Sequence, residues 1–334
     1  MARIHRPEPT ALVCGISGQD GAYLAAHLLE RGYAVVGTSR DPEACDRRGL
    51  AALGIERRVS IEPLAPTDPE ATIALLETLR PDEIYNLSGQ SSIALSFEQP
   101  AATFRSVTVA TVNLLEAVRV TKLPARLFLA GSTAMFGDNA GEPVDESTPV
   151  RPADPYALAK AAAFAQVEQY RRLHGVWACT GILSNHESPL RSERFVTQKI
   201  TAGACRIAAG DSQPLALGDL TVERDWGWAP EYVVAMHAML QTESPEDFVL
   251  ATGVSVPLET FVAEAFARLG LDWRRHVVCD ERFLRRDEVR RLRADPSRAA
   301  ERLGWRAETT IGAVARKMVE ARLFRDHSAL RRAV

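Results

Sequence analysis

Three glycines near the start of the chain lie between an apolar strand and a helix. The expected strand covers residues 11–14, and a helical pattern follows over residues 22–31. Glycines let such a turn close and let a diphosphate approach the backbone and the helix N-terminus. The loop therefore predicts dinucleotide binding, with a purely structural tight turn as the alternative. The residues assigned to it are Gly15, Gly18, Gln19, Asp20 and Gly21.

Strand and helix patterns alternate over the first 183 residues. Further strands are expected at 33–38, 59–61, 83–87, 126–130 and 177–183, and helices at 69–80, 102–120 and 156–174. This alternation predicts an α/β fold with a doubly wound, parallel Rossmann sheet. Functional residues should then lie at the carboxyl ends of the strands, and Ser132 follows such an end.

After residue 183 the alternation ends. We therefore predict a Rossmann domain for NADP over residues 1–183, with a return segment near 228–255. Residues 184–227 and 256–334 are expected to form a smaller C-terminal α/β substrate-binding lobe.

Composition excludes several classes of protein. The chain is 46% hydrophobic and 25% charged, which is ordinary for a soluble globular protein. Its net charge of −3 argues against nucleic acid and anionic lipid as partners, and its apolar runs are too short for a membrane span. Five scattered cysteines without metal spacing predict reduced thiols, and hence a cytoplasmic protein without a metal site.

Tyr156 and Lys160 lie four residues apart in an expected helix, so they share one face. A lysine ammonium beside a phenol favours the phenolate, and such a phenol can move a proton near neutral pH. With the hydroxyl of Ser132, the pair predicts hydride chemistry at an alcohol carbon, and Lys160 can also hold the nicotinamide ribose. The alternative is an ordinary tyrosine–lysine pair on a helix surface.

Arg40 ends the second expected strand. An acid at this place binds a free ribose 2′-hydroxyl, whereas an arginine suits a 2′-phosphate. Arg40 therefore favours NADP, while the adjacent Asp41 keeps NAD possible. The alternative is a solvent-exposed arginine without a cofactor role.

The motifs together resemble the extended short-chain dehydrogenase/reductase family, and within it the GDP-mannose 4,6-dehydratases. The resemblance covers nearly the whole chain. It is carried by residues 15–21, 84–92, 96–100, 185–189, 194–200, 224–227 and 295–297. It implies a GDP-sugar substrate, a tightly held NADP, and a homodimer or homotetramer.

The resemblance also implies roles for individual residues. Leu87 and Gln90 join the glycine loop, Arg40, Tyr156 and Lys160 as cofactor contacts. The implied substrate contacts are Ser91, Ser132, Asn185, Glu187, Lys199, Arg224, Arg285 and Glu288. Ser132, Tyr156 and Lys160 are the implied catalytic residues.

One position departs from the family pattern in a way that bears on the reaction. The family carries a glutamate two residues after the strand-end hydroxyl, where it removes the C5 proton and helps to expel the C6 hydroxyl. This chain has Ala134 there, and alanine can do neither. A second departure is Ser184, where the family usually has a phenylalanine.

Three hypotheses follow. The first is C4 redox chemistry on a GDP-hexose such as GDP-mannose, of the 4-epimerase or 4-keto-reductase type, because Ser132, Tyr156 and Lys160 remain. The second is full 4,6-dehydratase activity, with Asp138, Glu187 or water as a substitute base. The third is a non-catalytic NADP-binding homologue.

Overall fold

The computed structural model describes residues 8–284 and 289–332, with the side chains of the last helix described as far as Phe324. The chain divides into two compact units. The first comprises Met1–Met135, Asp154–Ile182 and Val233–Phe248, and the second comprises Phe136–Ala153, Leu183–Tyr232 and Val249–Val334.

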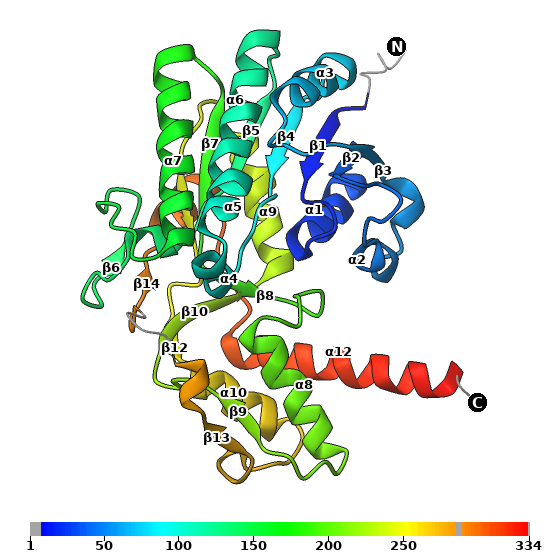
Figure 1. Ribbon diagram of the computed structural model, residues 1–334, viewed down its shortest axis with the longest axis vertical. Coiled ribbons are helices and arrows are strands. Elements are labelled where there is room, and N and C mark those ends of the chain that lie inside the picture. The colour runs from blue at the N-terminus through cyan, green and yellow to red at the C-terminus, as the bar shows by residue number, and fades with distance from the viewer. Residues whose placement is uncertain (1–7, 285–288, 333–334) are drawn as a thin grey trace. The chain divides into compact units, whose positions relative to one another are not determined.

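A seven-stranded sheet organises the first unit (Figure 1). Its strands are β1 (Thr10–Cys14), β2 (Ala34–Ser39), β3 (Ser60–Pro63), β4 (Glu83–Asn86), β5 (Arg126–Ala130), β7 (Ala178–Leu183) and β11 (Phe248–Leu250). The order is β3-β2-β1-β4-β5-β7-β11, and the pairs from β3 to β7 are parallel. The order reverses between β1 and β4, as in a doubly wound sheet. The predicted fold class is confirmed.

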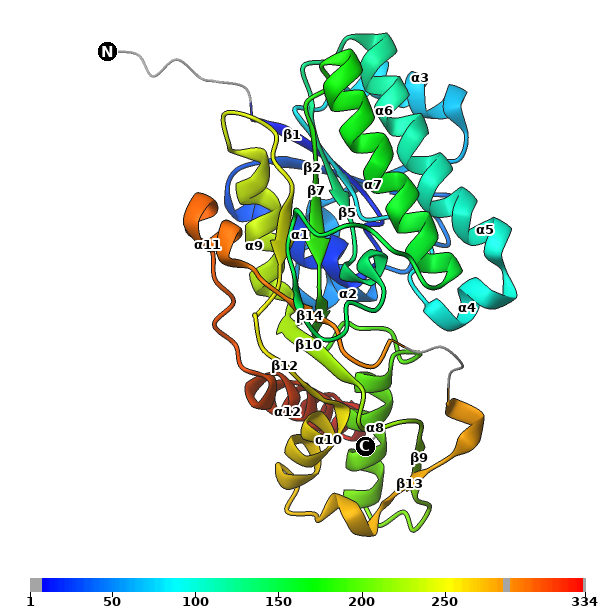
Figure 2. The same ribbon diagram turned by 90° about the vertical axis from the view of Figure 1, so that its left-hand side faces the viewer.

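Helices cover both faces of this sheet. They are α1 (Gln19–Glu30), α2 (Arg48–Ala52), α3 (Pro69–Leu79), α4 (Ile93–Glu98), α5 (Pro100–Phe104), α6 (Ala110–Thr121), α7 (Pro155–His174) and α9 (Ala229–Leu240). Helices α3, α6 and α7 lie on one face, and α1 and α9 on the other (Figure 2). Leu114, Leu115 and Val118 lie on one face of α6 and pack into the apolar core with Leu12 and Leu127.

The expected helix over residues 102–120 is not regular. Helix α5 and helix α6 are joined by a π-helical turn, Arg105–Val109. A π-helical turn accommodates one extra residue without ending the helix, so the apolar periodicity on either side does not reveal it.

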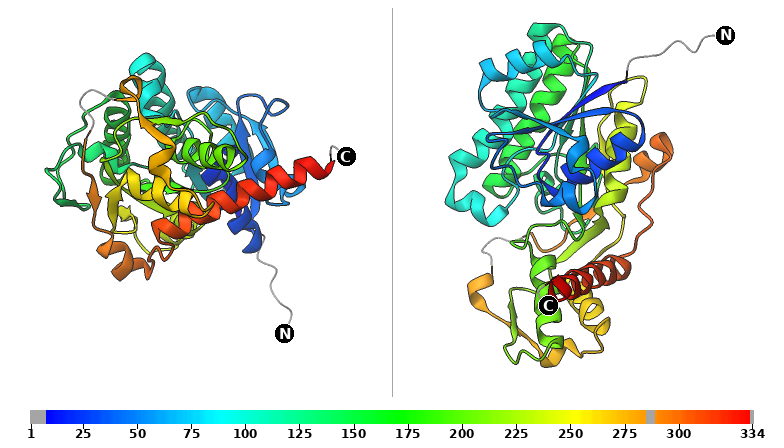
Figure 3. Two further views of the ribbon diagram at one scale, coloured as in Figure 1. Left: turned by 90° about the horizontal axis from the view of Figure 1, so that it is seen from below. Right: turned by 90° about the vertical axis from the view of Figure 1, so that its right-hand side faces the viewer.

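The second unit is built from small sheets and helices. Its strands are β6 (Pro143–Val144), β8 (Asn185–Glu187), β9 (Leu215–Leu217), β10 (Glu223–Trp228), β12 (Ser255–Pro257), β13 (Val277–Cys279) and β14 (Arg293–Ala294). Its helices are α8 (Val196–Ala208), α10 (Leu258–Ala267), α11 (Ser297–Leu303) and α12 (Ile311–Arg332). Helices α8, α10 and α12, drawn in green, yellow and red, pack on one another (Figure 3). Strand β10 lies between β8, to which it is parallel, and β12.

Short 3₁₀ turns complete the described chain, at Glu56–Arg58, Thr133–Phe136, Trp273–Arg275 and Glu281–Phe283.

The boundaries of the two units differ from the predicted domains at residues 136–153, which the prediction assigned to the first part. The segment Phe136–Ala153 belongs to the second unit. Its strand β6 pairs with β14, and Glu146 accepts the N–H of Val249 at 2.7 Å. Neither partner is near in sequence, so local patterns do not reveal the association.

The five cysteines, all among the described residues, are free in the structure, and their redox state stays a prediction. Across the described residues, no helix is both long and apolar enough to cross a bilayer, and no cluster of three or more potential ligands could hold a metal ion. The cytoplasmic location stays a prediction.

Candidate functional site

The glycine loop closes tightly after β1. Gly15 has a φ of +93°, and a Cβ there would lie 2.8 Å from the carbonyl of Leu87. A Cβ at Gly21 would collide with the carbonyl oxygen of Gly15. Gly18 is the N-cap of α1 and forms no side-chain cap, and the N-terminal end of a helix favours an anion. The loop therefore fits the diphosphate of a nicotinamide dinucleotide.

The N-terminal turn of α7 carries the predicted catalytic pair. Asp154 caps the helix by accepting the N–H of Ala157 at 2.8 Å, and Pro155 occupies the first turn. The helical spacing brings the Lys160 Nζ to 5.8 Å from the ring centroid of Tyr156. The expected shared face is thus present.

Lys160 is also tied to the strand that precedes Ser132. It is 7% exposed, and its Nζ donates to the carbonyl of Ala130 at 2.6 Å. Ala130 ends β5, two residues before Ser132, whose hydroxyl accepts the N–H of Ala134 at 3.2 Å. One buried ammonium therefore connects α7 to the strand end that holds the third predicted catalytic residue.

Burial lowers the pKa of the Lys160 ammonium from 10.5 to about 8, and the negative charge of Asp20 opposes this shift. The influence of Asp20 links the glycine-loop helix to the catalytic pair. At neutral pH most Lys160 side chains keep their proton, so a cation is present to stabilise a phenolate at Tyr156.

The shift of Lys160 makes stability depend on pH. Between the folded pKa near 8 and the unfolded value of 10.5, the unfolded state binds more protons, so the free energy of unfolding rises with pH. In Lys160→Met this contribution is absent. In urea unfolding, the free energy of unfolding of wild type should rise by about 2 kcal/mol relative to that of the variant between about pH 7 and about pH 9.5.

The exposed Lys317 supplies the control for this experiment. Lys317→Met removes an exposed lysine and is measured at the same two pH values for comparison. A constant difference between wild type and Lys160→Met would contradict the assigned shift.

The loop after β4 carries three predicted contacts, Leu87, Gln90 and Ser91. Leu87 donates its N–H to the carbonyl of Cys14 at 3.0 Å, which holds the loop beside the glycine turn. The Gln90 side chain donates to the carbonyl of Ser92 and to the hydroxyl of Thr103. The role of Ser91 stays a prediction.

Arg40 follows β2 and is exposed. The neighbouring Asp41 uses one carboxylate oxygen to accept the N–H groups of Glu43 at 3.0 Å and Ala44 at 3.1 Å. This oxygen stabilises a local turn, so one of the two carboxylate oxygens of Asp41 already has hydrogen-bond partners. The guanidinium of Arg40 is exposed.

In the second unit, Asn185 and Arg224 lie on neighbouring strands. Asn185 is the register partner of Trp226, two residues beyond Arg224 on β10. The Arg224 guanidinium donates to the carbonyl of Glu223 at 2.8 Å. Lys199, on α8, lies 3.5 Å above the ring of Phe283, and burial lowers its pKa. Arg285 and Glu288 lie outside the described residues.

Glu187 is anchored within the second unit. Its side chain is 2% exposed, accepts the hydroxyl of Thr197 at 2.6 Å, and lies 3.4 Å from the Arg191 guanidinium. These contacts hold β8 to α8. Its role as a substrate contact stays a prediction.

The position expected to depart from the family pattern follows the end of β5. Ala134 lies half-buried in the 3₁₀ turn Thr133–Phe136. Asp138, four residues on, is exposed and accepts the N–H of Ala140 at 2.9 Å. That carboxylate thus stabilises a turn on the surface of its own unit.

Ser184, the second departure, belongs to a buried polar network. Its hydroxyl lies 3.1 Å from an Asp225 carboxylate oxygen and 2.7 Å from the Tyr232 hydroxyl. Asp225 also accepts the N–H groups of Thr252 and Gly253. The Tyr232 ring stacks on His186 with 4.5 Å between centroids. The network fixes the start of β8, which carries Asn185.

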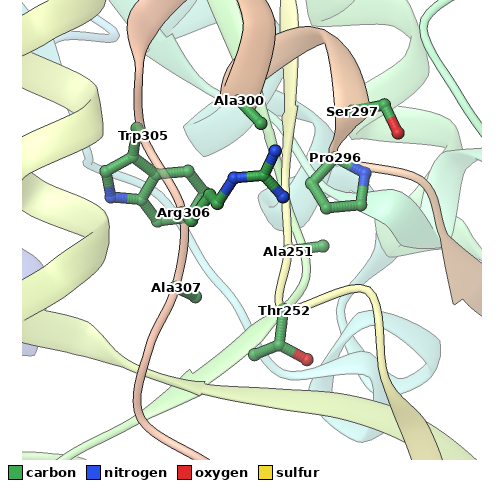
Figure 4. Close-up of a pocket in the computed structure, with 8 residues that line it drawn as sticks. All are labelled: Ala251, Thr252, Pro296, Ser297, Ala300, Trp305, Arg306 and Ala307. Carbon is green, nitrogen blue, oxygen red and sulfur yellow. The ribbon is translucent and has the colours of Figure 1, made fainter.

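A cavity of about 140 Å³ lies elsewhere in the second unit (Figure 4). Its lining consists of Ala251, Thr252, Pro296, Ser297, Ala300, Trp305, Arg306 and Ala307. None of the predicted site residues contributes to it, so this cavity is separate from the candidate site.

Comparisons with known proteins identify the family to which the chain belongs. The sequence profile of the family described as GDP-mannose 4,6 dehydratase matches residues 12–318. GDP-mannose 4,6 dehydratase 1 of Arabidopsis thaliana is 40% identical over 327 residues, which cover 95% of this chain and 90% of the relative. The chain belongs to the GDP-mannose 4,6-dehydratase family. GDP-mannose 4,6-dehydratase of Sinorhizobium fredii is 39% identical, covering 92% of this chain and 95% of its own.

Solved structures extend the comparison to the fold. UDP-glucose 4-epimerase of Thermotoga maritima superposes with a TM-score of 0.82 at 21% identity, covering 95% of this chain and 99% of its own. RMD from Pseudomonas aeruginosa, complexed with NADPH, superposes with a TM-score of 0.77 at 22% sequence identity. The match covers 93% of this chain and 98% of RMD. The GDP-mannose 4,6-dehydratase family consists of NAD(P)-dependent nucleotide-sugar enzymes, and the chain is a member of this enzyme family.

Proposed function

We propose that the protein carries out reversible redox chemistry at C4 of a GDP-hexose such as GDP-mannose, without eliminating water. The observation that carries the proposal is the combination of Ser132, Tyr156 and Lys160 with Ala134. The first three supply what an alcohol oxidation or ketone reduction requires. The fourth lacks the carboxylate on which water elimination depends.

Each residue has a distinct role in the proposed reaction. A nicotinamide nucleotide held by the glycine loop would supply the acceptor or donor of the C4 hydride. Tyr156 accepts the proton of the C4 hydroxyl during oxidation and donates it during reduction. Ser132 shares the hydrogen bond to the sugar oxygen, and the Lys160 ammonium stabilises the tyrosine phenolate.

The two products follow from the same machinery. A 4-keto sugar reduced on its opposite face leaves as the 4-epimer, whereas a 4-keto sugar supplied from outside leaves as the alcohol. Neither outcome requires removal of the C5 proton.

The carboxylates considered as substitute bases are engaged in other contacts. Glu187 is buried between Thr197 and Arg191, and Asp138 stabilises an exposed turn. A general base must be within hydrogen-bonding reach of its proton and free to accept it. These contacts support a reaction without dehydration.

Product mass tests the proposal. The protein would be incubated with GDP-mannose, and separately with a GDP-4-keto sugar and NADPH. An unchanged mass with a new retention time indicates epimerisation, and a gain of two hydrogens by the keto sugar indicates reduction. A product lighter by one water, formed at rates normal for dehydratases, would overturn the proposal.

The second candidate is GDP-mannose 4,6-dehydratase activity. The names of the relatives favour it, since those with 39–40% identity are GDP-mannose 4,6-dehydratases. It requires a base other than residue 134. Deuterium from solvent at C5 of a 6-deoxy product would support this candidate, and absence of any 6-deoxy product would exclude it.

We propose NADP as the cofactor, on the basis of the exposed Arg40 and the partly committed Asp41. A charge-assisted contact contributes about 1.5–3 kcal/mol, so Arg40→Ser should weaken NADP binding by about 10- to 100-fold. NAD binding should change little. Calorimetric titration with both nucleotides measures the effect, and Arg172→Ser, an exposed arginine on α7, is the control. Equal losses for both nucleotides would contradict the role of Arg40.

We also propose that the protein is a homodimer or homotetramer. Phe97, Phe104 and Leu158 are 58%, 41% and 54% exposed, and they lie on α4, α5 and α7, which pack together. A second copy covering these apolar side chains would remove them from water. Sedimentation equilibrium tests this, and a monomer at micromolar concentration would contradict it.

A further inference from the structure

The π-helical turn Arg105–Val109 lies between two segments that carry predicted site residues. One is the loop Leu87–Ser91 after β4, and the other is the first turn of α7. π-Helical turns are rare and occur frequently at functional sites, because the extra residue redirects the side chains of one turn. Here Ser106 and Thr108 make contacts outside their own helix.

The contact with the loop is close. Gly89 has a φ of +114°, and a Cβ there would lie 3.0 Å from the carbonyl oxygen of Ser106. Gln90 donates its N–H to the Ser106 hydroxyl at 3.2 Å. Its side-chain amide also donates to the hydroxyl of Thr103 at 3.0 Å, one turn earlier in α5. The predicted cofactor contact Gln90 therefore rests on this part of the helix.

The contact with α7 is a single buried hydrogen bond. The Thr108 hydroxyl donates to the carbonyl of Ala159 at 2.9 Å, and the two residues are 6% and 0% exposed. Ala159 lies directly before Lys160 and three residues after Tyr156. Lys160 is in turn bound to Ala130 of β5. The turn that presents the catalytic pair is therefore held both by the π-helical turn and by the sheet.

We propose that Thr108 is a positioning residue, whose bond to the Ala159 carbonyl holds Tyr156 and Lys160 in their reactive arrangement beside the Gln90 loop. This inference rests on the proposed function, in which Tyr156 moves the proton. Thr108 is bound to the carbonyl of Ala159, so it acts on the pair through the backbone of α7.

Loss of the Thr108 hydroxyl should change the position of Tyr156 and Lys160 while both side chains remain present. Thr108→Val preserves the shape of the side chain but removes the hydrogen bond from residue 108 to the Ala159 carbonyl. The turn can then move away from its neighbours, and water gains access to the buried ammonium. Better solvation of a buried lysine favours its charged form.

The first test requires no substrate. The chain contains four lysines, so labelling the lysine Cε with carbon-13 allows each to be followed by NMR. In Thr108→Val the pKa of Lys160 should rise from about 8 toward 10.5, by about half a unit or more. Thr108→Ser keeps the hydroxyl, so the pKa of Lys160 in this variant should equal that of wild type.

Thr121→Val is the matched control, because the Thr121 hydroxyl donates to Ala117 within its own helix. It should leave the titration of Lys160 unchanged. Urea unfolding of each variant separates positioning from a loss of fold. If Thr108→Val lowers stability while the Lys160 titration and kcat equal those of wild type, the role of Thr108 is structural and the proposal is overturned.

The second test is kinetic. With the GDP-sugar that wild type converts, Thr108→Val should lower kcat by about fivefold, the equivalent of one hydrogen bond, and change KM by less than about twofold. Thr108→Ser should restore kcat. If wild type converts no GDP-sugar, the proposed function fails, while the Lys160 titration still decides whether Thr108 positions the pair.

Discussion

Replacing Tyr156 with phenylalanine should lower the turnover of any GDP-sugar by about 10²–10⁴-fold, because the proton of the C4 hydroxyl then has no acceptor. The ring remains, and with it the contact to the Lys160 ammonium. The affinity for the nucleotide and for the sugar should therefore change little. Steady-state kinetics and calorimetric titration of the same variant measure the two quantities separately.

Tyr170→Phe is the matched control for this experiment. Tyr170 lies on the same helix, and its hydroxyl donates to Glu116 at 3.0 Å. Its loss should leave turnover unchanged. Turnover by Tyr156→Phe at the wild-type rate would contradict the catalytic role of the phenol. Tight binding without turnover by wild type on every GDP-sugar would instead favour the non-catalytic homologue.

Local spacing explains why much of the first unit could be predicted. The glycines follow a buried strand and open a helix, and both features depend on neighbours in sequence. Likewise, Tyr156 and Lys160 are four residues apart, so a regular helix is sufficient to bring them together. Asp68 caps α3 by accepting the N–H of Ala71, and this contact also depends only on neighbours in sequence.

Contacts between distant segments could not be predicted in this way. The bond from Lys160 to the Ala130 carbonyl spans 30 residues, and the bond from Thr108 to Ala159 spans 51. Both depend on how strands and helices pack, and the second also depends on a π-helical turn that leaves no periodic signal. The network of Ser184, Asp225 and Tyr232 is of the same kind, since Ser184 is distant in sequence from the other two residues.

In the proposed reaction, the side chain at residue 134 decides whether loss of water follows C4 oxidation. Ala134 donates its N–H to the Ser132 hydroxyl at 3.2 Å, so its side chain begins next to the strand-end residue that we expect to contact the sugar oxygen. The position is half-buried, so it is not sealed within the core. A carboxylate installed here would stand where the family has its base.

Ala134→Glu should therefore confer loss of water from GDP-mannose, at a rate at least about 10²-fold above that of the parent chain. Solvent deuterium should appear at C5 of the product, whose mass is lower by one water. Ala134→Gln is the control, because it matches the size of glutamate but cannot remove a proton, and it should behave as the parent does. Equal dehydration by the parent and by Ala134→Glu would show that another group already serves as the base. C4 oxidation without dehydration by Ala134→Glu would show that a carboxylate at this position does not reach C5.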